Sequence, residues 1–412
     1  MRDLLILGGG TAGTITANKL RARLDRDEWR ITVVDRDDDH HYQPGLLFLP
    51  FNSRPASSLT RSRRRLLAGG VDLVLGDLER VVPEKDTVEL TDGRRLRYDQ
   101  LVVATGTSPR PSETPGLLEG LRRRSVFDFY TPEGAVALRR ALDRFDHGRL
   151  VVHVAEMPIK CPVAPLEFAF LVDAWMRRRG LRDRVELVYA TPLSGPFTRP
   201  VASRLLTHML DERKIAVETD FVVERVDDAS SLVSYDGRDI PFDLLVTVPV
   251  NMGADFVARS DLGNELNYVP VDHGTLQSRD WENVFALGDA ADLPTSRAGS
   301  TAHFGVDVFV RNFADHVAGR PLTHRFDGHA NCFVESGNGR ALLIDFNYDV
   351  EPLPGSFPLP VGPFRLLEET RTNHLGKLAF EQIYWNVLLP GRPMPIPSAM
   401  TMRGKHENER TQ

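Results

Sequence analysis

The sequence of 412 residues is short of cysteine, of lysine and of long apolar runs. It has two cysteines, Cys161 and Cys332, which excludes a disulfide-rich secreted scaffold. No apolar run approaches the ~20 residues that a membrane-spanning helix needs. The first residues lack the charged and apolar segments of a signal peptide and read at once as a strand. We therefore expect a cytoplasmic protein.

The charge balance and the histidines exclude two further classes of site. There are 51 basic and 57 acidic residues, giving a net charge of −6, so no nucleic-acid partner is expected. The 12 histidines show no metal-ligand spacing, and we expect no metal site. The length suggests two or three domains, because domains average about 150 residues.

A glycine-rich motif follows the first expected strand. Residues 4–7 form a short apolar run that fits a buried parallel strand. The pattern G-x-G-x-x-G comes next, at Gly8, Gly10 and Gly13, and residues 14–24 read as a helix. In such a motif the glycines allow a tight turn, the approach of a pyrophosphate and close packing of helix on strand.

A second expected strand, residues 31–34, ends at Asp35, which lies 22 residues beyond Gly13. An acidic residue at this spacing binds a ribose hydroxyl and disfavours a 2′-phosphate. Strand, glycine turn, helix, strand and acid together predict a dinucleotide site. The alternative is a glycine-rich turn without a ligand.

Two later segments end in small-residue turns. Residues 98–106 read as a buried strand closed by Thr105 and Gly106. Residues 283–291 read as another strand, closed by Gly288 and Asp289, and Asp289 would hydrogen-bond a polyol such as a ribityl chain. Each is otherwise a plain buried strand with a turn. Together with the N-terminal motif, they resemble the signatures of flavoproteins with two dinucleotide-binding domains, which implies FAD in the first domain.

A second strand-helix-strand unit lacks its glycines. Residues 149–155 and 185–189 read as strands and 166–179 as a helix, but prolines and Cys161 occupy the turn. Without glycines a pyrophosphate cannot approach the backbone closely. We therefore predict a duplicated fold whose nicotinamide site is lost.

Cys161 stands in this turn beside Lys160, and Glu167 follows in the next helix. A helix N-terminus and an ammonium group both lower a thiol pKa. Two cysteines that meet in space can pass two electrons to a flavin. The alternatives are two unrelated buried cysteines and a solvated carboxylate at Glu167.

Three segments carry a more specific resemblance. Residues 158–167, 331–333 and 374–381 resemble segments of sulfide:quinone oxidoreductases and of the flavoprotein subunit of flavocytochrome c sulfide dehydrogenase. The resemblance implies a redox pair of Cys161 and Cys332 and a proton relay at Glu167. It also implies that Lys377 lies near the flavin and that Phe380 contacts the quinone.

The sequence departs from this family in two places. It lacks the third cysteine of many members, and residues 41–44 stand where flavocytochrome members place the cysteine that links FAD. We therefore expect non-covalent FAD. After the Gly-Asp turn, Arg297 keeps the charge of the family's lysine but not its geometry, which puts a flavin contact there in doubt.

Four segments bear on the surface of the protein. Residues 373–389 read as an amphipathic helix, which with the loop 45–51 would contact a membrane, although core packing explains the helix equally well. Arg61, Arg63, Arg64 and Arg65 would favour anionic lipid or form a solvated face. Residues 402–412 read as a disordered tail.

The expected fold is α/β, with two Rossmann-like doubly wound domains and a smaller C-terminal domain bearing an amphipathic helix. Residues 1–108 and 245–325 would form the FAD-binding domain, residues 109–244 the second Rossmann-like domain with a degenerate nucleotide site, and residues 326–412 the quinone and membrane-contact domain.

The expected activity is FAD-dependent oxidation of sulfide to polysulfide or sulfane sulfur, with membrane quinone as acceptor. The protein would be peripheral on the inner face of the plasma membrane, and its oligomeric state, a homo-oligomer included, is left open. The alternatives are a relative with a cytochrome acceptor, a type II NADH:quinone reductase, and a non-turnover flavoprotein that senses or carries reactive sulfur.

Overall fold

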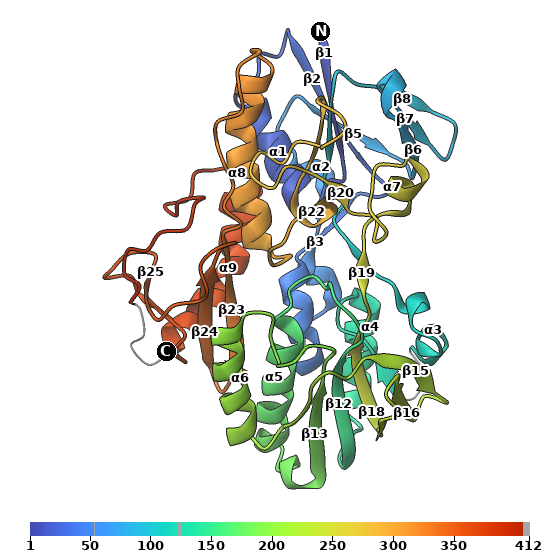
Figure 1. Ribbon diagram of the computed structural model, residues 1–412, viewed down its shortest axis with the longest axis vertical. Helices are drawn as coiled ribbons and strands as arrows, with labels where there is room; N and C mark the ends of the chain where they lie inside the picture. The colour runs from blue at the N-terminus through green and yellow to red at the C-terminus, as the bar shows by residue number, and fades with distance from the viewer. Residues whose placement is uncertain (53, 122–124, 407–412) are drawn as a thin grey trace.

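The computed structural model describes residues 1–52, 54–121 and 125–406, and within them two parallel sheets of five strands and a C-terminal mixed sheet (Figure 1). The first sheet has the order β21-β9-β1-β2-β5. Its strands are β1 (Arg2–Leu7), β2 (Trp29–Asp35), β5 (Val71–Leu75), β9 (Gln100–Val103) and β21 (Val284–Ala286).

Residues 4–7 of β1 and 101–103 of β9 are apolar and buried, as expected of parallel strands covered on both faces. Helices α1 (Thr11–Arg21) and α8 (Gly299–His316) pack against each other beside it, and Trp29 meets Phe313 edge-on with ring centroids 5.7 Å apart. All strand pairs of the sheet are parallel, so their carboxyl ends gather at one edge. That edge carries the glycine motif.

The second sheet has the order β11-β18-β12-β13-β14. Its strands are β11 (Val126–Phe127), β12 (Gly148–Val154), β13 (Val185–Ala190), β14 (Ala216–Glu218) and β18 (Leu244–Val248), and helices α4 (Pro132–Leu142), α5 (Ala164–Arg178) and α6 (Pro200–Glu212) accompany it. Because β18 pairs with β11 and β12, the predicted boundary between residues 244 and 245 cuts a strand of the second sheet.

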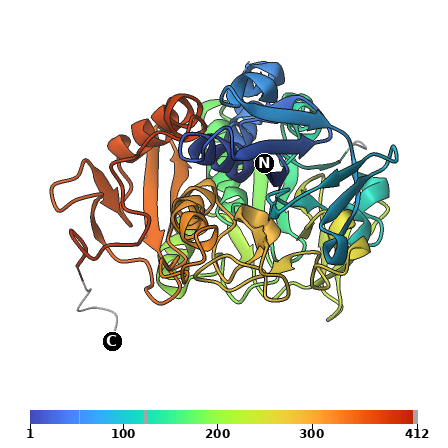
Figure 2. The ribbon, with the colours of Figure 1, turned by 90° about the horizontal axis from the view of Figure 1, so that it is seen from above.

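The C-terminal sheet has the order β23-β24-β26-β25. It comprises β23 (Ala330–Gly337), β24 (Arg340–Phe346), β25 (Gly355–Phe357) and β26 (Phe364–Leu366), and helix α9 (Arg371–Ile383) packs on it before a π-helical turn, η7 (Tyr384–Leu388). Figure 2 shows this block at one side of the molecule, beside the segments coloured blue and green. The predicted fold class is confirmed.

Short sheets complete the described chain. They are β3 (Asp39–His41) with β4 (Thr60–Ser62); β6 (Leu78–Val82), β7 (Thr87–Leu90) and β8 (Arg95–Arg97); β10 (Ser108–Pro109) with β19 (Asn251–Met252); β15 (Val223–Asp227), β16 (Ser231–Ser234) and β17 (Asp239–Pro241); and β20 (Val269–Pro270) with β22 (Ala291–Asp292). The short helices are α2 (Arg63–Leu66), α3 (Leu117–Gly120) and α7 (Asp255–Arg259).

Two surface predictions were wrong. The expected membrane loop 45–51 lies in a 3₁₀ helix, η1 (Gln43–Phe51), whose residues Leu46, Leu47 and Leu49 are buried in the core. The first part of the expected tail, residues 402–412, packs against the protein, because the Lys405 ammonium is buried and lies 2.5 Å from the Asp345 carboxylate. Residues 407–412 lie outside the described residues.

No helix in the described ranges is both long and apolar enough to cross a bilayer.

Candidate functional site

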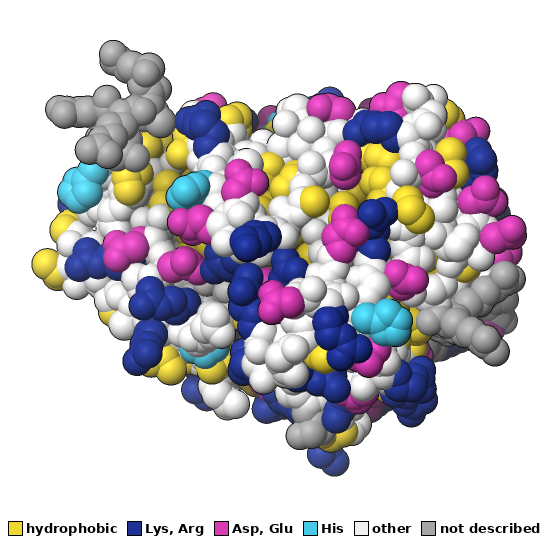
Figure 3. Space-filling view, turned by 90° about the horizontal axis from the view of Figure 1, so that it is seen from below, with side chains coloured by type: hydrophobic (Ala, Val, Ile, Leu, Met, Phe, Trp, Pro, Cys, Tyr) yellow, Lys and Arg dark blue, Asp and Glu magenta, His cyan; other side chains and the backbone are white. Residues whose placement is uncertain are grey.

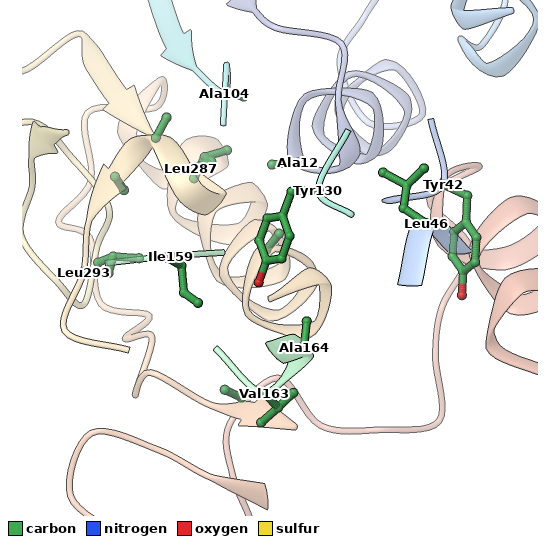
Figure 4. Packing of buried hydrophobic residues seen from close by; sticks show 14 of the residues in the cluster. Ala12, Tyr42, Leu46, Ala104, Tyr130, Ile159, Val163, Ala164, Leu287 and Leu293 are labelled. Carbon is green, nitrogen blue, oxygen red and sulfur yellow. The ribbon is translucent and has the colours of Figure 1, made fainter. Parts of the chain in front are cut away.

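A cavity of about 300 Å³ lies where the two parallel sheets and the C-terminal sheet meet. Figure 4 shows Ala12, Ala104 and Leu287 from the first sheet region around the same space as Tyr130 of the second, with Tyr42 to one side. Its walls therefore come from segments far apart in the sequence.

The glycine motif forms one end of this cavity. Gly8 has a φ of +93°, and a Cβ there would lie 2.6 Å from the carbonyl oxygen of Ala104. A Cβ on Gly13 would lie 1.8 Å from the Gly8 carbonyl oxygen, so both positions exclude any side chain. A Cβ on Gly10 would meet nothing within 4 Å, and no side chain caps the N-terminus of α1. This open, uncapped helix start fits the phosphates of a dinucleotide.

Asp35 does not line the cavity, but its carboxylate supports the glycine loop through a hydrogen bond to the loop backbone. Its Oδ2 accepts the Gly9 backbone N–H at 2.7 Å, and its Oδ1 lies 3.3 Å from the Arg63 guanidinium. Arg63 also donates to the Gly9 carbonyl oxygen at 2.7 Å. Arg63 is buried, so the prediction that it belongs to a lipid-facing or solvated basic cluster was wrong.

Thr105, Gly106, Gly288 and Asp289, the residues of the two predicted cofactor turns, all line the cavity. The Thr105 hydroxyl is buried and has no partner among the residues that the structure describes. Burial raises the pKa of Asp289, although Arg297 and Lys160 oppose that effect. A hydroxyl without a partner and a carboxylate on the cavity wall are groups that a polyol ligand would satisfy.

Cys161 and Cys332 reach the same cavity from different sheets. Both are free thiols. Cys161 precedes α5 with a left-handed backbone, φ +49°, at a position where an ordinary dinucleotide turn would have glycine. Its backbone N–H donates to the Arg297 carbonyl oxygen at 2.7 Å, and its carbonyl accepts from Ala164 at 2.8 Å. Cys332 lies on β23, opposite Ile344 of β24.

The expected lowering of the Cys161 pKa is not found. Burial raises the pKa of the Cys161 thiol well above its ordinary value, and Glu167 and Cys332 add to the rise. Lys377 and the backbone N–H of Ala164, at the start of α5, oppose it. Burial likewise raises the pKa of Cys332 to about 12. As separate thiols, both groups are therefore protonated at neutral pH.

Glu167 and Lys377 form a buried ion pair beside the two sulfurs. Burial raises the pKa of Glu167 to about 7, although the paired Lys377 opposes the shift. Burial alone would lower the pKa of Lys377, but Glu167 and Glu335 raise it. The Glu167 carboxylate also accepts the Glu335 backbone N–H at 2.8 Å. It is not a solvated helix carboxylate, since its side chain is 2% exposed.

Phe380 lines the cavity one turn beyond Lys377. Its ring centroid lies 6.4 Å from that of Tyr384, which also reaches the cavity. The Tyr384 hydroxyl bonds to Thr11 at 2.8 Å and to His40 at 2.7 Å. His40 and Tyr384 are not identified from the sequence, because no local motif relates residues so far apart in the chain.

The outer face of α9 carries exposed apolar side chains. Leu375 is 61% exposed and Leu378 is 49% exposed, whereas Tyr384 and Trp385 at the end of the expected helix are buried. Residues 373–389 therefore divide into a part with exposed apolar side chains and a part packed in the core, and the expected membrane contact stays a prediction.

A second hollow lies at the far end of the second sheet and is lined by charged residues of both signs. Arg149 pairs with Glu186 there, and Arg182 pairs with Asp173. Figure 3 shows basic and acidic side chains interleaved on the lower face. Because side chains of opposite charge lie together, this hollow has no strong electrostatic field of one sign. Among the described residues, no group of three or more His, Cys, Asp and Glu side chains is placed to hold a metal ion.

Comparison with known proteins gives a consistent result. Residues 2–154 match the family model described as pyridine nucleotide-disulphide oxidoreductase. The chain is 28% identical to the mitochondrial sulfide:quinone oxidoreductase of Schizosaccharomyces pombe over 93% of this chain and 89% of that one. It is 24% identical to the Mus musculus protein of the same name, over 94% and 86%. The crystal structure of the sulfide:quinone oxidoreductase from Aquifex aeolicus superposes with a TM-score of 0.81 at 20% identity, over 95% and 92% of the chains.

Proposed function

Because the chain belongs to the sulfide:quinone oxidoreductase family within the pyridine nucleotide-disulphide oxidoreductase flavoproteins, and is an FAD-dependent oxidoreductase, we propose that it oxidises sulfide and reduces a quinone. The observation that carries the proposal is the convergence of Cys161, Cys332, Glu167 and Lys377 on the cavity that the glycine loop closes.

FAD would be held non-covalently by the Gly8–Gly13 turn, Thr105, Gly106 and Asp289. When bound, it supplies a two-electron acceptor between sulfur and quinone. Asp35 is committed to the Gly9 N–H, so it supports the loop and would offer its remaining lone pairs to a ribose. Residues 41–44 place Tyr42, Gln43 and Pro44 on the cavity wall, and none of these side chains is a cysteine that could form a thioether.

The two cysteines are proposed to cycle between a disulfide and a bridge with one more sulfur. HS⁻ attacks one sulfur of the disulfide, so that an S–S bond forms as the Cys161–Cys332 bond breaks. One cysteine becomes a persulfide and the other becomes the leaving group. When the two rejoin through the added sulfur, two electrons leave the pair and sulfide has become sulfane sulfur. A nucleophile such as a second HS⁻ then takes this sulfur as HSS⁻, and the Cys161–Cys332 disulfide re-forms.

Glu167 is proposed to move the proton that this exchange requires. The leaving sulfur takes a proton because burial raises its thiol pKa. Glu167 has a pKa of about 7, so near neutrality it can give that proton and take it back when the bridge re-forms. The ammonium of Lys377 keeps a positive charge beside whichever group is anionic.

Quinone is proposed to contact Phe380 and Tyr384 on the α9 side of the cavity. Leu375 and Leu378 on the outer face of the same helix would touch the membrane in which the quinone dissolves. The protein would then sit on a membrane surface without crossing it.

The test is an anaerobic titration of the purified holoprotein's flavin spectrum with sulfide, with NADH as a parallel control. Bleaching by sulfide alone, reversed by a soluble quinone analogue, supports the proposal. Silence with sulfide and bleaching with NADH overturns it in favour of an NADH:quinone reductase. Bleaching by sulfide without steady-state quinone reduction indicates a protein that senses or carries sulfur.

A further inference from the structure

A second acid-base pair lies next to the Glu167–Lys377 ion pair, at the interface of β23 and α9 (Figure 1). His374 Nδ1 is 2.8 Å from Glu335 Oε1 and 3.1 Å from Oε2. The Glu335 side chain is 1% exposed, and that of His374 is 23% exposed. One member of the pair therefore reaches solvent while the other is buried.

A backbone hydrogen bond and a shared face of α9 link the Glu335–His374 pair to the Glu167–Lys377 pair. Glu335 donates its backbone N–H to the Glu167 carboxylate at 2.8 Å. Lys377 follows His374 by one turn of α9, so both side chains point to the same side. Lys377 donates to Glu167 and, at 3.1 Å, to the carbonyl oxygen of Phe333 on β23.

Burial raises the pKa of Glu335 above the ordinary carboxyl value against the effect of its charged neighbours. Lys377 and His374, both on α9, oppose that rise in pKa. Glu167 of α5 is the third charged neighbour, and its own pKa is raised partly by Glu335. Glu335 thus lies between the partly exposed imidazole of His374, which bonds to its carboxylate, and Glu167, which bonds to its backbone N–H. A partly exposed imidazole followed by two buried acids is arranged to pass protons rather than to hold a fixed charge.

The proposed reaction needs such a route. HS⁻ loses two electrons and one proton as it becomes sulfane sulfur, whereas quinone takes two electrons and two protons to become quinol. The balance, HS⁻ + H⁺ + quinone → sulfane sulfur + quinol, draws one proton from solvent in each turnover. Glu167 alone cannot supply it, because its carboxylate is buried and it regains only the proton that it gave.

We propose that His374 and Glu335 carry this proton from solvent to the Glu167–Lys377 pair. This inference rests on the proposed function and assigns it a proton-uptake route. His374 takes a proton from water at its partly exposed ring, Glu335 receives it across their hydrogen bond, and Glu335 passes it to the buried pair. Neither residue touches sulfur, so both act through Glu167 and Lys377.

The test uses His374→Ala in the holoprotein and separates the two halves of the turnover. Bleaching by sulfide consumes no solvent proton and should keep its wild-type rate. Reoxidation by a quinone analogue should slow about tenfold or more, the scale on which proton transfer assists catalysis. The loss should grow with pH, as free protons become scarcer, and added imidazole should restore the rate in proportion to its concentration.

Two further variants keep the test sharp. Glu335→Gln removes the carboxylate that accepts the proton but keeps the size of the side chain, so it should slow reoxidation, and imidazole should not restore the rate. His208→Ala, at an exposed histidine of α6 paired with Glu212, should leave both rates unchanged. The FAD content and melting temperature of each variant report a purely structural loss.

Either of two results overturns the inference: unchanged reoxidation in His374→Ala, or a slow rate that imidazole does not restore although FAD content and melting temperature are normal. These failures differ from failure of the proposed function, in which the wild-type protein itself does not respond to sulfide.

Discussion

The hydroxyl groups of Thr11 and Tyr384, 373 residues apart in the chain, share a 2.8 Å hydrogen bond. Thr11 is the first residue of α1, directly after the glycine turn, and Tyr384 begins the π-helical turn after α9. The end of α9 is therefore fastened to the loop that would hold the phosphates of FAD. Asn18 strengthens this attachment by donating to the Leu389 carbonyl oxygen at 2.7 Å.

We expect Tyr384→Phe to weaken FAD retention and to lower the free energy of unfolding by about 1–3 kcal/mol, because the buried Thr11 and His40 groups would lose a partner. The measurement is FAD per chain after gel filtration, together with urea unfolding. Tyr235→Phe is the matched control, since Tyr235 is 72% exposed. Equal FAD content and stability in both variants would show that the bond is dispensable.

Each of Cys161→Ser and Cys332→Ser should abolish bleaching of the flavin by sulfide while leaving FAD bound. The reason is that a single sulfur can neither form nor re-form the proposed bridge. The measurement is the flavin absorbance in an anaerobic titration. The double variant, which has no cysteine left, should be no worse than either single variant. Full activity in any of the three would rule out the bridge.

Glu167 should set a pH limb in the rate of bleaching at saturating sulfide. Its pKa is raised from 4.5 to about 7, so the side chain is a neutral acid below that pH and a carboxylate above it. Since the leaving sulfur needs a proton, the rate should fall as pH rises through about 7. Glu167→Gln should lower the rate by about 100-fold or more and remove the limb. Glu265→Gln, at an exposed position, should keep the wild-type profile. A limb that survives in Glu167→Gln belongs to another group.

Lys405→Met should lower the free energy of unfolding by about 3–5 kcal/mol, because it leaves the buried Asp345 carboxylate without its cation. Asp345 also bonds to His329 at 2.8 Å, so the loss should spread through the C-terminal sheet. Urea unfolding measures the effect, and Lys85→Met, at an exposed lysine, is the control. A stability equal to that of the control would mean that the segment around Lys405 is free in solution.

The pair Leu375→Glu and Leu378→Glu should weaken binding to phospholipid vesicles about tenfold or more, since it replaces exposed apolar surface with charge. Co-sedimentation measures the binding. Leu118→Glu changes an equally exposed leucine of α3 and should have no effect. Vesicle binding that persists in the double variant would place the membrane contact elsewhere.

The sequence predicted the parallel sheets well, because most of their strands are short apolar runs, and glycine turns follow β1, β9 and β21 of the first sheet. The segments around Cys161 and Cys332 reach one cavity, and the redox pair that the resemblance implies stays a prediction. Three features escaped. The burial of Arg63 depends on the glycine loop that it supports, and the burial of η1 depends on its packing against α4 and α5. The pKa of Cys161 depends on how deeply the thiol is buried. Local sequence patterns do not reveal which distant residues come into contact, and they do not reveal how far burial removes a side chain from water.

The anchoring of Cys161 has a consequence for the product. Its N–H and C=O are both bonded, to Arg297 and to Ala164 with Tyr130, and Cys332 is held in the ladder of β23 and β24. The two backbones are therefore held in place, and only the side-chain sulfur atoms can rotate. In a bridging mechanism, the fixed distance between these two backbones would limit how many sulfur atoms the bridge can hold. That number would then be a property of the protein and would not change with sulfide concentration.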